Sequence, residues 1–115
     1  MTLTELKALG KAPPFLTEEG LKTLQNSYLV DNETPTDMYR RLAKTAANIL
    51  KKPELEERFF DVLFKGWLCP ATPVASNFGL SRGLPISCFS EHIEDSISGI
   101  FNANHELAML SKNGG

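Results

Sequence analysis

The feature that most constrains this chain is a change of character near Cys69. Before it, apolar residues recur at three- and four-residue spacing, the period of helices that pack along one face. After it, prolines and glycines punctuate a stretch too irregular for a helix: Pro70, Pro73, Gly79, Gly83 and Pro85. The sequence therefore predicts a helical region over residues 1–68 and a different region over residues 69–115.

Three helices are expected in the first region. The first follows Thr17, whose side chain can cap a helix with acidic residues in its first turn. The second begins at Thr34, with Pro35 at the first helical position and Asp37 at the third. The third starts near Pro53. Apolar stripes of this kind usually form a packing layer, so no chemistry is expected here.

The spacing also predicts which side of each helix is buried. The expected buried residues are Leu21, Leu24 and Tyr28 in the first helix, Met38, Leu42, Ala46 and Ile49 in the second, and Leu55, Phe59, Val62, Leu63 and Gly66 in the third, with Trp67 at its end. Phe59, Phe60 and Phe64 are candidates for the core.

The second region predicts one strand and one helix. Residues 84–89 form a short apolar run between turn residues, typical of a strand buried on both faces, and Cys88 would lie on it. A helix is expected from Ser96 to Leu110, with Gly114 as its terminator. One strand cannot form a sheet by itself, so its partners must come from outside this chain. The fold class is therefore mixed α/β.

Composition excludes some classes of function. Twelve basic and fourteen acidic residues give a net charge of −2, which disfavours binding to nucleic acid. Only two cysteines are present, with neither a signal-type leader nor an apolar run long enough to span a membrane. These features predict a reducing, cytoplasmic setting without membrane contact.

Four segments of the second region resemble one known family. They are Pro-Ala-Thr-Pro-Val-Ala-Ser-Asn at 70–77, Arg-Gly-Leu-Pro-Ile-Ser-Cys-Phe-Ser at 82–90, Glu-Asp-Ser-Ile at 94–97 and Leu-Ser-Lys-Asn-Gly-Gly at 110–115. Together they look like the large catalytic subunit of class I ribonucleotide reductase, and the preceding helices resemble it more loosely. The resemblance implies a helical N-terminal region followed by the first strand and helix of a ten-stranded α/β barrel that another polypeptide completes. It leaves no room for the ATP-binding cone of many members, so control through that cone is not expected.

The resemblance also assigns roles to residues of the substrate site. Cys88 matches one cysteine of the redox pair that reduces the ribonucleotide. Thr72 and Ser87 match positions that hold the substrate diphosphate, and Gly114 and Gly115 match positions where the backbone approaches the substrate. Each has a plainer alternative, namely an inert buried thiol, turn-forming hydroxyl residues and a helix C-cap.

An effector site is implied at the start of the last helix. Asp95, with Ser96 beside it, matches the place where a deoxynucleotide or ATP effector is bound, although Asp95 can equally be read as a helix cap. The helix from Ser96 to Leu110 corresponds to part of the family's dimer interface. Cys69 has no counterpart among the functional cysteines and is expected to be a small packing residue. No metal site and no cofactor bound by this chain are expected.

The leading hypothesis is therefore an enzyme part, the N-terminal piece of a split or fragmented ribonucleoside-diphosphate reductase that is inactive by itself. The second redox cysteine and the radical cysteine would lie in the remaining large-subunit polypeptide. Further implied partners are a small subunit with the radical-generating metal centre, a thioredoxin or glutaredoxin, and a ribonucleoside diphosphate substrate. Two alternatives stay open, a stand-alone helical adaptor and a regulatory fragment that binds a reductase or another protein.

Overall fold

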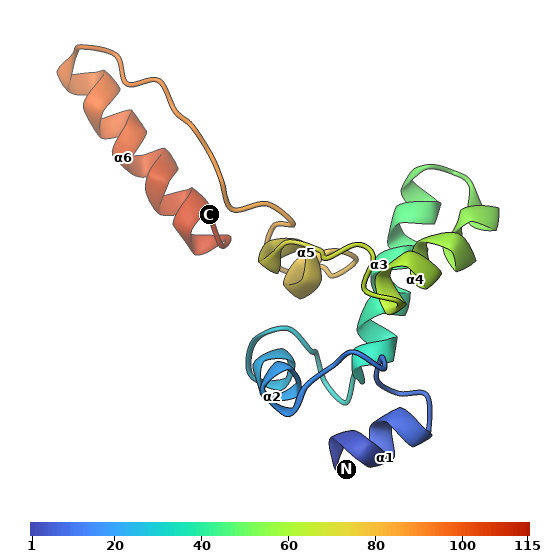
Figure 1. Cartoon of the computed structure of the whole chain (residues 1–115). Coiled ribbons are helices and arrows are strands. Elements are labelled where there is room, and N and C mark those ends of the chain that lie inside the picture. Colours follow the sequence, from blue (N-terminus) through green and yellow to red (C-terminus); the bar gives the residue numbers. More distant parts are fainter.

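The computed structural model describes all 115 residues and contains only helices (Figure 1). In chain order they are α1 (Leu3–Ala8), α2 (Glu18–Ser27), α3 (Pro35–Ile49), the 3₁₀ turn η1 (Pro53–Leu55), α4 (Glu56–Phe64), α5 (Thr72–Asn77) and α6 (Ile97–Lys112). None of them is long and apolar enough to cross a lipid bilayer.

The molecule has two parts, which we call the body (residues 1–83) and the arm (residues 84–115). The body packs α1 to α5 together, whereas the arm leaves it as an extended segment that turns back into α6 (Figure 1). The projecting arm makes the molecule elongated, with principal extents of 60 × 33 × 23 Å.

Helix-capping signals in the sequence predicted the starts of α2 and α3. The Thr17 side chain accepts a hydrogen bond from the Gly20 backbone N–H, at 3.1 Å. Thr34 and Asp37 form a reciprocal capping box at the start of α3, with Pro35 in its first turn. The third predicted helix is also present, although it opens with the 3₁₀ turn at Pro53 before α4 begins.

The core lies where α3 packs against α4 and α5, and a second cluster lies between α1 and α2. The first cluster contains Met38, Tyr39, Leu42, Ala43, Leu63 and Ala75, and the second contains Leu3, Leu6, Ala12, Leu16 and Leu21. Phe59, Phe60 and Phe64 are partly buried against the first cluster, with the rings of Phe60 and Phe64 stacked at a centroid distance of 5.2 Å.

The predicted buried faces need two corrections. The buried stripe of α3 continues through Ala43 and Ala47, while Ile49 is 65% exposed because it lies on the far side of the last turn. Gly66, expected on the buried face of the third helix, is exposed, because α4 ends at Phe64 and Gly66 takes a left-handed φ of +73° that turns the chain away. Trp67, expected at the end of this helix, lies beyond it and is 74% exposed.

The predicted strand over residues 84–89 is not formed in this structure. The segment is extended but belongs to no sheet, and its backbone makes no hydrogen bond to another strand. A strand requires a neighbour to pair with, and the structure contains no strand at all. The mixed α/β class is accordingly replaced by an all-helical architecture for these 115 residues.

Candidate functional site

Helix α5 carries the first of the predicted site residues, and Arg41 of α3 holds this helix in place. The Arg41 guanidinium donates to the carbonyl oxygens of Ala75 and Phe78 at 3.0 and 2.6 Å, which satisfies acceptors at the end of α5. It also forms a two-point ion pair with Glu33, at 2.8 and 3.1 Å, and both side chains are mostly buried. This network fixes α5 against α3.

Thr72 is the first residue of α5 and lies beside the end of α2. Its Oγ1 is 3.1 Å from the hydroxyl oxygen of Tyr28, a hydrogen-bond distance. One turn later, Ser76 Oγ donates to the Thr72 carbonyl at 2.9 Å. The Thr72 hydroxyl is thus exposed and held in one orientation, which is suitable for binding a polar ligand.

Helix α6 of the arm is capped at both ends. At its start, Ser96 Oγ accepts a hydrogen bond from the Gly99 backbone N–H at 2.9 Å. At its end, the N–H groups of Gly114 and Gly115 donate to the carbonyls of Ser111 and Leu110 at 3.2 and 2.8 Å, and Gly114 has a φ of +94°. This pair of bonds is a Schellman motif, so the two glycines do form a helix C-cap.

The return of α6 brings both ends of the arm together at its base. A Cβ added to Gly115 would lie 2.8 Å from the ring of Phe89, the residue that follows Cys88. The structure therefore brings Ser87 and Cys88 close to Gly114 and Gly115.

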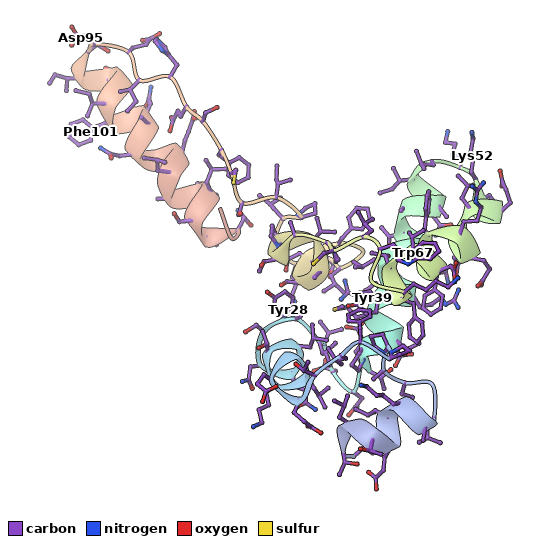
Figure 2. All side chains as sticks on the ribbon, viewed as in Figure 1. Tyr28, Tyr39, Lys52, Trp67, Asp95 and Phe101 are labelled. Atoms are coloured by element: carbon purple, nitrogen blue, oxygen red, sulfur yellow. The ribbon has the colours of Figure 1, made fainter.

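The predicted effector residues lie at the opposite end of the arm. Figure 2 shows Asp95 at the tip, far from Tyr28 and the body. Ser96 provides the N-cap of α6, while Asp95 precedes the cap and its side chain is exposed. Thr72 belongs to the body, so the predicted residues fall into three places: α5, the base of the arm and its tip.

Both cysteines have free thiols. Cys88 lies on the extended segment and is exposed, so it is not the inert buried thiol that was the alternative interpretation. Cys69 is also exposed, so its predicted role as a packing residue is wrong. His92 and His105 are exposed, and nowhere in the chain do three or more His, Cys, Asp or Glu side chains gather in a way that could hold a metal ion.

Sequence reasoning did not predict the pairing of Glu91 with Glu106 inside the arm. The pKa of the Glu91 carboxyl is raised, first because its surroundings are desolvated, then because its protonated form can hydrogen-bond to the Glu106 side chain and because the charge of Glu106 repels its own. The structure holds no such bond while both groups are ionised. Glu91 Oε2 is shielded from solvent and has no hydrogen-bond partner. The two carboxyl groups face each other across the arm, from residues fifteen positions apart, and no local pattern indicates such a contact.

With this geometry described, comparison with known proteins identifies the family. Residues 14–83 match the family model of the ribonucleotide reductase all-alpha domain, and the chain belongs to that family. The matched range covers most of the body and ends where the arm begins.

Three relatives show the extent of the likeness. The large subunit of ribonucleoside-diphosphate reductase from Invertebrate iridescent virus 6 is 34% identical over 85% of this chain and 10% of its own length. The alpha subunit from Helicobacter pylori (strain ATCC 700392 / 26695) is 33% identical over 84% of the chain and 13% of its own. The solved Actinobacillus ureae class Id ribonucleotide reductase alpha subunit has a TM-score of 0.82 and 37% identity over 89% of this chain and 20% of that one. The chain therefore spans a fifth or less of these relatives.

Proposed function

We propose that this chain forms the all-alpha domain and the first part of the catalytic barrel in the large subunit of a ribonucleoside-diphosphate reductase. The observation that carries the proposal is the likeness to the Actinobacillus ureae alpha subunit, which covers 89% of the chain. The body contains 83 of the 115 residues, so this likeness must extend into the arm. The remaining barrel strands lie outside these 115 residues.

The exposed surface of the arm supports assembly with further protein. Its extended segment has unpaired backbone groups, and large apolar side chains are exposed along the segment and along α6, a combination that favours pairing with a neighbouring strand. These side chains are Ile86, Phe89, Ile93, Ile97, Ile100, Phe101, Leu107 and Met109. In the proposed enzyme, residues 84–89 become the first barrel strand and α6 packs at a subunit interface.

Cys88 is the proposed redox residue. Together with a second thiol from elsewhere in the large subunit, it delivers two electrons and two protons to the ribonucleotide, whose 2′ hydroxyl leaves as water. The two thiols end as a disulfide, which a thioredoxin or glutaredoxin then reduces by thiol exchange. Its exposed position in the arm is consistent with access for both the substrate and the external dithiol.

Residues of α5 and of the base of the arm are proposed to hold the substrate diphosphate. Thr72 and Ser87 offer hydroxyl donors, and the bare backbone at Gly114 and Gly115 allows close approach of the ligand. A deoxynucleotide or ATP effector is proposed to bind at the tip, near Asp95. The radical comes from a metal centre in the small subunit, and no cofactor is assigned to this chain.

Assembly can be tested by co-expressing the tagged chain with the remainder of a related large subunit. We expect co-purification, which Phe101→Ser together with Leu107→Ser should weaken because both side chains are exposed on the arm. Ile49→Ser is the matched control, since Ile49 is equally exposed but belongs to the body. The purified complex should bind a deoxynucleoside triphosphate. A complex that ignores deoxynucleotides would instead favour the helical adaptor, and loss of reductase activity on addition of the chain would favour the regulatory fragment.

A further inference from the structure

A single hydrogen bond connects the arm to the body. Among all hydrogen bonds and ion pairs of the chain, the only one that joins residues 1–83 to residues 84–115 runs from Asn77 Nδ2 to the carbonyl oxygen of Leu84, at 2.9 Å. Asn77 is the last residue of α5, and Leu84 is the first residue of the arm. The Asn77 side chain is therefore the one polar contact that can set the direction in which the arm leaves the body.

The packing around this bond restricts the Asn77 amide to one position. A Cβ added to Gly83 would lie 2.6 Å from Asn77 Cγ, so the amide packs directly against the bare Gly83 backbone. Gly83 has a φ of +63°, in the left-handed region that favours glycine. Glycine is thus required both for the turn and for the close contact.

The body side of this contact is itself rigidly held. Asn77 belongs to α5, whose end is bound by Arg41, and Gly79 packs so closely on Thr45 of α3 that an added Cβ would collide with its hydroxyl. A path of direct contacts therefore runs from α3 through the end of α5 to Leu84, four residues before Cys88. Thr72 lies at the other end of the same short helix.

We propose that Asn77 is a positioning residue that sets the direction of the arm and thereby places Cys88 relative to Thr72. The biological purpose of this placement rests on the proposed function, because Cys88 and Thr72 are its thiol and phosphate-binding residues. The placement itself is a property of this chain alone and can be measured without substrate or partner.

The chain provides its own probes for this measurement. Cys69 in the body and Cys88 in the arm are its only cysteines, and both are exposed. Spin labels on these two thiols report the distance between body and arm by double electron–electron resonance. We expect one main distance in the unmodified chain, with a narrow distribution.

Three variants of the junction should broaden this distribution. Asn77→Ala removes the donor, Asn77→Asp keeps the shape but replaces the donor with a carboxylate facing a carbonyl, and Gly83→Ala pushes the amide away. Loss of the Asn77–Leu84 hydrogen bond should lower the population of the bonded arm relative to the detached arm about five-fold. This is the factor that about 1 kcal/mol gives at room temperature. Asn48→Ala is the matched control, because Asn48 is exposed on α3 and its side chain makes no hydrogen bond within the chain.

An unchanged distance distribution in Asn77→Asp with normal helix content by circular dichroism would overturn the proposal. So would equal broadening in Asn48→Ala. Because this readout requires no turnover, the two proposals can fail separately. A narrow distance distribution without reductase activity after assembly would reject only the proposed function. An active assembly whose unmodified chain shows a broad distance distribution would reject only the positioning role of Asn77.

Discussion

Arg41 joins α3 to the end of α5 and to the loop before α3. Its guanidinium joins Glu33 to two carbonyls at the end of α5, and its own side chain and that of Glu33 are mostly shielded from water. Sequence reasoning did not identify it, because Ala75 and Phe78 lie 34 and 37 positions further along the chain. From sequence alone, an arginine on a helix is expected to be exposed to solvent.

We predict that Arg41→Ala destabilises the chain strongly. The substitution leaves the Glu33 carboxylate buried without a counter-charge and removes both donors to α5, so the free energy of unfolding should fall by about 3 kcal/mol. Urea unfolding followed by circular dichroism measures this change. Arg58→Ala is the control, because Arg58 is exposed and forms no ion pair, and it should change the free energy by less than about 0.5 kcal/mol. Equal effects would contradict the assigned role.

Asp37 provides a test by pH. Its pKa is lowered, first by the hydrogen bond from the Thr34 hydroxyl at 2.6 Å and second by the Thr34 backbone N–H at 2.9 Å. Because the pKa is lower in the folded chain than its usual 3.8, the carboxylate stabilises the fold above that pH and loses this effect as the pH falls through the folded-state pKa.

We therefore predict that Asp37→Asn lowers the free energy of unfolding by about 0.5 to 1 kcal/mol at neutral pH. The difference from the unmodified chain should shrink as the pH falls below 3.8 and through the lowered folded-state pKa, because Asp37 itself then becomes protonated. Urea unfolding across this range provides the measurement, with Asp31→Asn as a control because Asp31 is exposed and makes no side-chain hydrogen bond. A constant difference at every pH would show that charge is not the cause.

At the scale of elements, the packing of α3 against α4 forms the main core. A buried and an exposed leucine of the same region, Leu42 and Leu50, test this packing. Leu42 is 3% exposed in the middle of α3, whereas Leu50 at its end is 54% exposed. We predict that Leu42→Ala lowers the free energy of unfolding by about 3 kcal/mol through lost burial and an unfilled cavity. Leu50→Ala should change it by less than about 0.5 kcal/mol. Thermal unfolding that ranks them in the opposite order would contradict this core.

The sequence predicted those helices that carry a clear local start signal and an apolar stripe. α2 and α3 carry capping residues directly before an apolar stripe, and these signals suffice for their starts. The same kind of signal, the Thr2 and Glu5 capping box, marks α1, which was not predicted. α5 was read as a loop because of Pro73, although proline is tolerated in the first turn of a helix.

The segment 84–89 forms no strand here for a different reason. Its apolar run carries the signal of a buried strand, but pairing depends on neighbours that these 115 residues do not contain. For the candidate site, the sequence indicated the residue types and their resemblance to a family. It could not indicate that α6 returns to place Gly115 against Phe89, because that contact depends on the path of the whole arm.

At the scale of the whole molecule, the chain combines a packed helical body with an arm that exposes apolar surface. The body matches the all-alpha domain of ribonucleotide reductase, and the chain spans a fifth or less of its relatives. The arm presents its apolar side chains to solvent and is joined to the body by one hydrogen bond. The fold is thus well packed at one end and leaves apolar surface exposed at the other. The predicted boundary at residue 69 between a helical region and the start of the barrel stays a prediction.

The most direct test of the central claim is reductase turnover in an assembly reconstituted from this chain, the remainder of the large subunit and the small subunit. Formation of a deoxyribonucleoside diphosphate is measured with the unmodified chain, with Cys88→Ser and with Cys69→Ser, two exposed thiols in one chain. The account predicts that all three assemble, that Cys69→Ser keeps its activity and that Cys88→Ser loses it. Full activity in Cys88→Ser would contradict the account, because the chain would then contribute no redox thiol to the reaction.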